Sequence, residues 1–421
     1  MIPQSVQEPA ITDGDHRRKP ILTDNQAQQA GAILSRIKHD LTDQLRSLGH
    51  GDPSLSSGSC GVSLFLHQYA ETFHDDETAI NADRLLDASL DRISERFSGP
   101  SLYSGFPGVA WAINLMDKTE DIECETIDET LLGLVREGRW SGHFDVIQGI
   151  IGLGVYALER APHPLAIETV KEITQHLINT AERRRDGITW KTSPSWMPPR
   201  HVQMFPKGNY NLGMAHGVPG VIAFLGRVQQ VGLASTEVMG LLDDAVHWLL
   251  RQQLEEHTDG WFGCIRGDDQ PARLAWCYGD PGIAAGLLVA ARGCGRPIWE
   301  DKAVELALCA ASRPVETSGI FDAGICHGAA GLGHLFGTMY RKTGREELRA
   351  AAQTWMQVAI SMCRTDSGVG GYQSYSPSPE HPDRWRSDPG LLSGAAGIGL
   401  ALLSAIDSAV APWDRMLLVS E

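Results

Sequence analysis

The chain has 421 residues, of which 42% are hydrophobic and 21% are charged, a composition typical of a globular protein with a sizeable core. Its formal charge of −16 argues against binding to a nucleic-acid backbone, which requires a basic surface. No apolar run approaches the roughly 18 residues of a transmembrane helix, so we expect no membrane-spanning segment.

The N-terminal residues 1–25 are polar and contain several prolines. We predict that they are disordered, because they offer too little apolar surface to fold. They lack the apolar core of a secretory signal, so we expect a cytoplasmic protein. Its eight cysteines should therefore be reduced, and their scattered positions argue against a disulfide framework. Residues 26–421 are predicted to form a single domain.

A glycine repeat runs through this domain. The pattern G-x-x-G, followed by a small or apolar run, occurs seven times at intervals of 44 to 68 residues. The first glycines of the seven motifs are Gly58, Gly105, Gly149, Gly217, Gly279, Gly328 and Gly394. Such an interval holds two helices of about 12–18 residues with their loops, so each motif is predicted to mark one helix pair.

Two kinds of helix are predicted within each pair. Segments between the motifs, such as 86–97 and 241–254, have one apolar face, whereas the segments after the motifs are small and apolar on all sides. The pattern predicts an all-α fold of seven inner helices alternating with seven outer helices. Neither terminal repeat has a polar cap, so a closed α/α toroid is favoured over an open solenoid.

Two segments interrupt this pattern. Residues 183–212 and 368–390 are rich in proline, glycine and aromatic residues. We interpret 183–212 as an inserted loop or small irregular extension of the toroid, and 368–390 as a similar loop before the last repeat.

The position just before the first glycine is polar in every repeat. Its occupants are Ser57, Ser104, Gln148, His216, Tyr278, His327 and Ser393. In a toroid, equivalent positions of successive inner helices face one central cavity. The repeat therefore predicts a shared polar site.

Two adjacent repeats place a cysteine one position earlier, at Cys277 and Cys326. Since adjacent repeats are neighbours in space, we expect Cys277, Cys326 and His327 to converge. Two thiolates and an imidazole suit tetrahedral Zn²⁺, and three ligands leave one position open for a substrate. A metal-bound thiol loses its proton near neutral pH, so the site suits chemistry on sulfur. The alternative is that these are buried residues that bind no metal.

Three further residues are candidates for catalysis. His216 could be a general acid or base, and the alternative is a structural histidine. Asp145 could orient His216, or could cap a helix. Arg273, four residues before Cys277, could stabilise an anionic intermediate, or could form a salt bridge.

Several of these segments resemble the lanthionine synthetase C-like family, and in particular its stand-alone cyclases. The matching text is FDVIQGIIG, NLGMAHGVPG, RLAWCYGDPG, CHGAAGLG and LLSGAAGIGLALL, and the resemblance extends from about residue 57 to residue 419. It implies an α/α toroid of seven inner and seven outer helices that holds one Zn²⁺. It also implies that the metal ligands are Cys277, Cys326 and His327.

The family resemblance further implies a reaction, an intramolecular Michael addition. A peptide cysteine attacks dehydroalanine or dehydrobutyrine, and a lanthionine or methyllanthionine ring forms. The residues implied in cyclisation are His216, Asp145, Arg273 and Tyr278, with Tyr278 lining the site. The expected partners are a dehydrated precursor peptide, a separate dehydratase and an exporter that would hold the protein peripherally at the membrane.

Three alternatives stay open at this stage. An enzyme of this fold could add glutathione to dehydrated residues instead of closing rings. A protein prenyltransferase also activates a thiol on zinc, but the Cys326–His327 pair and the WCYG text disfavour that class. A peptide-binding scaffold with a structural zinc would require a fourth protein ligand, for which Cys264 is the nearest candidate in the sequence.

Overall fold

The computed structural model describes residues 20–95, 99–116, 122–255, 259–377, 383–410 and 412–420. Most of the N-terminal segment predicted to be disordered, residues 1–19, lies outside these ranges, and the first helix begins at Asp24. Among the described helices, none is long and apolar enough to cross a membrane.

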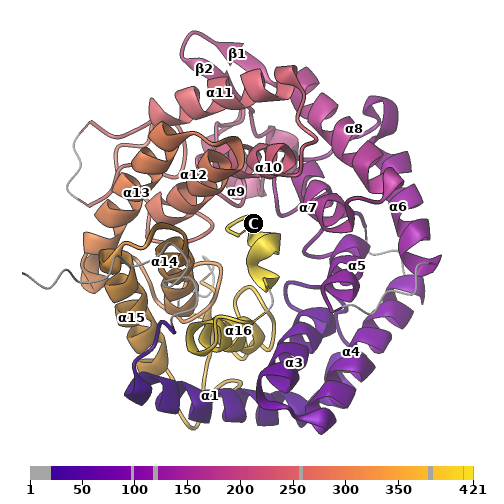
Figure 1. Cartoon of the computed structure of the whole chain (residues 1–421), viewed down its shortest axis with the longest axis vertical. Helices are drawn as coiled ribbons and strands as arrows, with labels where there is room; N and C mark the ends of the chain where they lie inside the picture. Colours follow the sequence, from indigo (N-terminus) through magenta and orange to yellow (C-terminus); the bar gives the residue numbers. More distant parts are fainter. Residues whose placement is uncertain are drawn as a thin grey trace, which may run out of the picture.

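The described helices form two concentric rings (Figure 1). The inner ring consists of α3 (Ser59–Phe73), α5 (Phe106–Leu115), α7 (Ile150–Arg160), α10 (Val218–Gln230), α12 (Asp280–Cys294), α14 (Ala329–Thr343) and α16 (Ala395–Ile406). The outer ring consists of α1 (Asp24–Thr42), α4 (Asp76–Glu95), α6 (Ile122–Val135), α8 (Pro164–Thr180), α11 (Thr236–Leu250), α13 (Pro297–Ser312) and α15 (Glu346–Ser361). The predicted α/α toroid is confirmed.

The two rings bury their side chains as the sequence pattern predicts. The inner helix α12 buries twelve successive residues, from Asp280 to Ala291. The outer helix α4 buries only one face, which includes Ala82, Leu85 and Leu86. The seventh outer helix is α1, which contacts α16, α15 and α3. The N-terminal helix therefore closes the ring beside the last inner helix.

The repeated glycines are required by close backbone packing. Each first glycine is the N-cap residue of its inner helix. At every second glycine, a Cβ atom would lie only 1.8–2.5 Å from the carbonyl oxygen six residues earlier. Any side chain there would force the loop away from the helix, so the motif fixes each loop against the start of its helix.

The loops before the inner helices are joined to one another by hydrogen bonds. The bonds run between residues that stand two positions before the first glycine: Ser56 N to Tyr103 O, Leu392 N to Ser56 O, Cys326 N to Leu392 O, Cys277 N to Cys326 O and Ala215 N to Cys277 O. Val146 N to Ala215 O and Ser101 Oγ to Ile147 O complete the circle. This circle holds equivalent positions of neighbouring repeats side by side, although they are 44 to 68 residues apart in sequence, and it joins the last repeat to the first.

The C-terminal segment lies inside the inner ring, where η5 (Trp413–Leu417) forms a short 3-10 helix (Figure 1). Tyr103 Oη donates to Met416 O at 2.8 Å, and Trp276 Nε1 donates to Leu417 O at 2.9 Å. Because Trp276 precedes Cys277, this segment supports the loop that carries the first predicted metal ligand.

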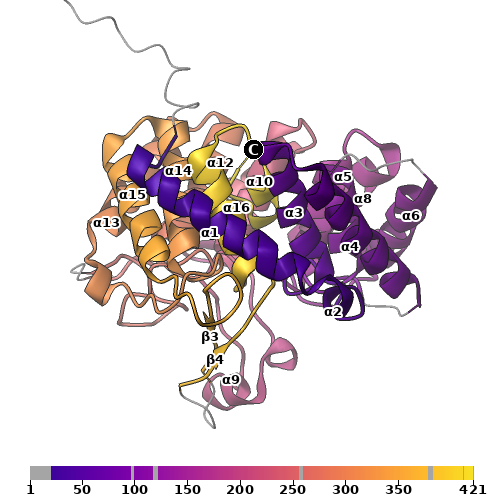
Figure 2. The same cartoon turned by 90° about the horizontal axis from the view of Figure 1, so that it is seen from below.

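Parts of two extensions project from one face of the toroid (Figure 2). Residues 183–212 contain most of the hairpin β1 (Glu182–Arg184) and β2 (Gly187–Thr189), then η3 (Pro194–Trp196) and α9 (Pro199–Met204). The second extension is the antiparallel pair β3 (Ser374–Tyr375) and β4 (Trp385–Arg386). The remaining short elements are α2 (Leu45–Gly49), η2 (Arg136–Gly138) and η4 (Val315–Thr317).

Candidate metal and active site

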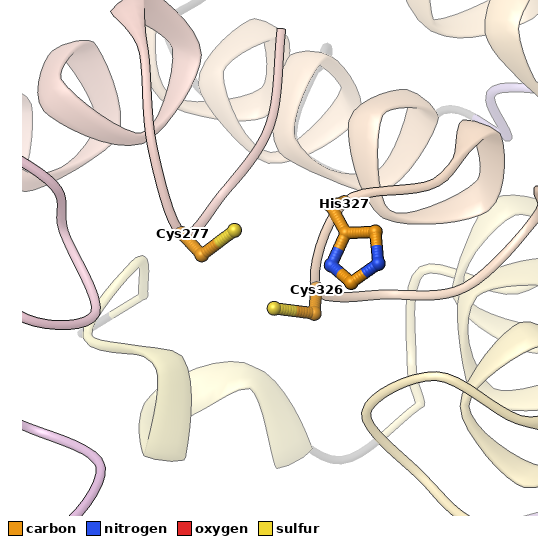
Figure 3. A group of neighbouring side chains, drawn as sticks. All are labelled: Cys277, Cys326 and His327. Carbon is orange, nitrogen blue, oxygen red and sulfur yellow. The ribbon is translucent and has the colours of Figure 1, made fainter. Parts of the chain in front are cut away.

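Cys277, Cys326 and His327 lie together at the starts of α12 and α14 (Figure 3). One ligand atom of each residue lies within 4.8 Å of the ligand atoms of the other two. The backbone bond from Cys277 N to Cys326 O, at 3.2 Å, holds the two loops in register. Zinc bonds to sulfur and nitrogen measure about 2.0–2.3 Å, so an ion fits between atoms this close.

The two thiols influence each other strongly. The pKa of Cys277 is held well below its usual range, first by a hydrogen bond from Cys326 and then, against the effect of burial, by His327 and Arg273. The pKa of Cys326 is raised, by its hydrogen bond to Cys277 and by burial. One thiolate thus forms readily and a second does not. A bound cation is the ordinary means by which two such thiolates coexist.

Cys264, the candidate fourth ligand, is not part of this cluster. Its side chain is exposed, and its backbone N–H donates to Asp268 Oδ2 at 2.8 Å. Within the described residues, no other histidine, cysteine or carboxylate joins Cys277, Cys326 and His327. The donor set therefore has three members, which is the pattern of a metal site with an open position.

His216 and Asp145 form a close pair in the two repeats that precede the repeat of Cys277. His216 Nδ1 lies 2.5 Å from Asp145 Oδ2. The other carboxylate oxygen, Oδ1, accepts from Gln148 N at 2.8 Å, so Asp145 both contacts the histidine and stabilises its own turn. Burial lowers the pKa of His216, but the hydrogen bond and charge of Asp145, with a smaller effect of Cys277, raise it overall above its usual value.

Tyr278 lies next to this pair. Asn211 Nδ2 donates to Tyr278 Oη at 2.9 Å, and the Tyr278 ring centroid lies 6.2 Å from that of His216. Burial, opposed by the Asn211 hydrogen bond, raises the pKa of Tyr278 to about 12, so the phenol keeps its proton at neutral pH. The next residue, Gly279, has φ of +92°, which a residue with a side chain rarely adopts.

Arg273 is close enough to the cysteines for its charge to lower the pKa values of both Cys277 and Cys326. In the described part of the chain it forms no salt bridge with a carboxylate. Its positive charge therefore acts on the two cysteines and, among the described residues, is not paired with a carboxylate.

A cavity of about 660 Å³ opens beside the His216–Asp145 pair. Its walls are His143, Asp145, Gln148, Thr192, Ser195, Trp196, Met197, Pro198, His201, Asn209, Asn211, His216 and Tyr278. The extension 183–212 supplies eight of these thirteen residues. The sequence predicts an extension here but not its contribution to this cavity, because the segment has no counterpart in the other repeats.

His143 is a residue of this site that sequence reasoning missed. Its Nδ1 accepts from Asp145 N at 3.1 Å, and its ring contacts Trp196 in a tilted arrangement at 5.0 Å between centroids. Burial lowers the pKa of His143, and the charge of Asp145 opposes this effect without cancelling it. The lowered pKa favours a neutral ring. The available signal was its place two residues before Asp145, outside the repeated polar position.

Comparison with known proteins adds independent findings. The family described as lanthionine synthetase C-like protein matches residues 49–418. Nisin biosynthesis protein NisC of Lactococcus lactis subsp. lactis is 25% identical over 311 residues, which cover 67% of this chain and 72% of that protein. Glutathione S-transferase LANCL1 of Danio rerio is 28% identical over 134 residues, 31% of each chain. The solved structure of nisin cyclase superposes with a TM-score of 0.76 at 21% identity, covering 91% of this chain and 97% of that one.

Proposed function

The chain belongs to the lanthionine synthetase C-like family, and from that premise we propose that it is a zinc-dependent lanthipeptide cyclase. The reaction joins cysteine thiols of a peptide to dehydroalanine or dehydrobutyrine residues of the same peptide. The observation that carries the proposal is the three-membered Cys277, Cys326 and His327 cluster close to the His216–Asp145 pair.

Cys277, Cys326 and His327 would hold one zinc ion. When bound, zinc lowers the pKa of a coordinated substrate thiol and presents it as a thiolate. Two sulfur ligands suit this chemistry, since thiolates leave the metal electron-rich and a thiolate bound beside them nucleophilic. Hydrolytic zinc sites more often use histidine and carboxylate ligands.

The bond changes of the reaction balance without a further reactant. The substrate sulfur forms a bond to the β-carbon of the dehydro residue, and the π bond between the α- and β-carbons breaks. Its electrons move into an enolate, and the α-carbon then takes a proton. The thiol proton is thus replaced by a proton delivered at carbon, which is a task for an acid–base residue.

Four residues of the candidate site suit three roles in this series of reaction steps. His216, oriented by Asp145, would exchange the protons, since its raised pKa keeps it partly protonated near neutral pH. Arg273 would stabilise the enolate through its positive charge. Tyr278, protonated and held by Asn211, would line the site as a hydrogen-bond donor.

The partners follow from the chemistry of the substrate. A dehydrated precursor peptide is the substrate, and the dehydration must precede ring closure, so a separate dehydratase would supply it. We place the reaction in the cytoplasm, with an exporter as the peripheral contact at the membrane. A purified dehydratase and this chain, mixed with the precursor, should form a complex that survives gel filtration.

A second activity deserves a direct comparison, because the match to glutathione S-transferase LANCL1 covers 31% of this chain. In that case the thiol would come from glutathione and no ring would form. One experiment separates the two. The protein is incubated with a synthetic peptide carrying one dehydroalanine and one cysteine, with and without glutathione, and the products are alkylated before mass spectrometry.

Cyclisation predicts a peptide of unchanged mass whose thiol resists alkylation. Glutathione addition predicts a mass increase of one glutathione and a thiol that still reacts. A scaffold without catalytic activity predicts that the thiol reacts fully and that no adduct forms. Either of the last two results, obtained with zinc-loaded protein, would contradict the cyclase proposal.

A further inference from the structure

Three aromatic side chains form a row on the surface of the second extension. Phe321 and Tyr375 have ring centroids 5.1 Å apart, and Tyr375 and Trp385 have centroids 5.0 Å apart. Large hydrophobic side chains are usually buried, but Phe321 is 59% exposed and Trp385 is 46% exposed. We call Phe321, Tyr375 and Trp385 the aromatic row.

The row is shaped by the β3–β4 pairing. Tyr375 and Trp385 are directly opposite each other in the antiparallel register, so their side chains lie on one face of the hairpin. The cross-strand contact holds both rings without covering their outer surfaces. Phe321 extends the row from a different part of the chain, the loop between α13 and α14.

That same loop carries two of the metal ligands, five and six residues after Phe321. Asp322 fixes the loop to the hairpin, since its Oδ2 accepts from Tyr375 N at 2.8 Å and its Oδ1 accepts from Gly324 N at 3.1 Å. The carboxylate is almost fully buried. The aromatic row and the Cys326–His327 loop therefore belong to one connected unit.

A cavity of about 380 Å³ adjoins the row, with Phe321, Trp385, Tyr372 and Arg364 among its walls. One exposed arginine, Arg364, is among these walls, and two more, Arg384 and Arg386, flank Trp385 in the chain. Within the described part of the chain, none of the three forms a salt bridge. The apolar surface thus lies beside arginine side chains, although the formal charge of the chain is −16.

Exposed aromatic side chains in contact with one another mark interaction sites more often than isolated ones do. Aromatic rings and arginines are also the residues that dominate binding energy at peptide interfaces. The β3–β4 hairpin projects from the same face as α9, which belongs to the segment that walls the His216 cavity (Figure 2). A peptide crossing this face can contact the hairpin while another part of it occupies the catalytic cavity.

We propose that the aromatic row, with Arg364 beside it, binds a segment of the peptide substrate in which an apolar side chain stands near a carboxylate. The apolar side chain would pack on Trp385 and Phe321, and the carboxylate would pair with an arginine. The identity of the occupant as substrate rests on the proposed cyclase function, whereas the chemistry of the surface does not. Such a site would retain the peptide while successive rings close.

The test measures binding apart from catalysis. The wild-type protein is titrated into a fluorescein-labelled dodecapeptide of Gly and Ser with one Phe and two Asp residues, which has neither a thiol nor a dehydro residue and therefore cannot react. Fluorescence anisotropy gives Kd. Two control peptides replace the Phe by Ser or both Asp residues by Lys.

We expect Trp385→Ala to raise Kd about tenfold, the usual effect of truncating an aromatic anchor, and Trp385→Phe to restore most of the affinity. Arg364→Glu should weaken the Asp-containing peptide and strengthen the Lys-containing one. The matched control is Phe73→Ala, which removes another exposed phenylalanine, at the end of α3, and should leave Kd unchanged.

Equal Kd values for the parent protein and Trp385→Ala, or equal binding of all three peptides, would overturn the proposal. So would a concentration-dependent dimer in sedimentation velocity that Trp385→Ala abolishes, because a second copy would then occupy the row. Failure of the cyclase function is detected separately: wild-type protein that binds the peptide through Trp385 but closes no ring would refute the function and leave the binding site intact.

Discussion

Two of the histidine–aspartate pairs among the described residues have their closest atoms within 2.8 Å of each other, and the surroundings of these two pairs differ. His216 Nδ1 lies 2.5 Å from Asp145 Oδ2, and His334 Nε2 lies 2.8 Å from Asp414 Oδ2. The side chain of His216 is 38% exposed and faces the 660 Å³ cavity. The side chain of His334 is 5% exposed.

The second pair connects the ring to the segment that fills it. His334 belongs to α14 and Asp414 to η5, and the His334 ring contacts the Trp413 ring in a tilted arrangement at 4.7 Å between centroids. Asp414 also accepts a hydrogen bond from the Ser420 hydroxyl. Under the proposed function, the same two side-chain types would thus serve a reaction in one place, whereas they hold a buried segment in the other. The distinction comes from access to the cavity, not from the strength of the pair.

The largest difference between the effect on the reaction rate and the effect on stability should come from His216→Asn. We expect the cyclisation rate to fall by about 10²–10⁴, the usual contribution of a general acid or base. The melting temperature should hardly change, because the ring is partly exposed. Single-turnover assays and thermal unfolding of the same preparation measure the two effects. A large loss of stability with a normal rate would assign His216 the role that we give to His334.

Asp414→Asn should show the reverse behaviour. Removing the charge leaves a buried His334 without its partner and should cost about 3 kcal/mol of the free energy of unfolding. The rate per folded molecule should remain normal. Denaturant titration with a parallel assay at low denaturant distinguishes this result from a catalytic role for Asp414.

The pH dependence of stability sharpens this prediction. Burial raises the pKa of Asp414, but the hydrogen bond and charge of His334, aided by Ser420, outweigh it and lower the pKa to about 2. A depressed carboxyl pKa stabilises the fold above the unfolded value of about 3.9, and this contribution is lost as the pH falls towards 2. The difference in stability between wild type and Asp414→Asn should therefore shrink progressively as the pH falls from about 5 to 2.

Asp145→Asn should act on the reaction through His216. We expect a rate loss of about 100-fold and a lower pKa for His216, because the hydrogen bond and charge that raise it are weakened. If the protonated ring donates the proton, the alkaline limb of the pH–rate profile should move to lower pH. An unmoved limb would show that the titrating group is not His216.

The smallest effect is expected at His143. Its Nδ1 accepts from the Asp145 backbone, so His143→Ala removes one neutral hydrogen bond and should reduce the rate less than tenfold. His143→Asn, which can still accept that bond, should recover part of the loss. A loss as large as that of His216→Asn would mean that His143 itself exchanges protons with the substrate.

Much of the fold follows from a pattern that the sequence repeats. The glycine motifs predict the inner helices, because each second glycine meets a carbonyl oxygen six residues earlier. The same repeat predicts that Cys277 and Cys326 are neighbours, and the backbone bond between them lies in the circle of loop-to-loop hydrogen bonds. A signal that recurs seven times overrides the ambiguity of any one segment.

Features that do not recur could not be predicted in this way. His334 lies within α14, where its spacing gives no sign of a partner in the C-terminal segment. The support of Trp276 by Leu417 and the wall that Trp196 forms depend on where two non-repeated segments fold. The aromatic row likewise combines a hairpin and a loop that are more than 50 residues apart in sequence.

The central claim is that Cys277, Cys326 and His327 bind one catalytic zinc ion. Elemental analysis of purified wild-type protein, matched with Cys326→Ala and with the control Cys60→Ala at a buried cysteine outside the cluster, tests it most directly. We predict about one zinc per chain in the wild type and in Cys60→Ala, and little zinc in Cys326→Ala. Substrate peptide treated with Cys326→Ala should keep free thiols that react with an alkylating agent. Full zinc occupancy in Cys326→Ala, or undiminished ring closure by protein stripped of metal, would contradict the account.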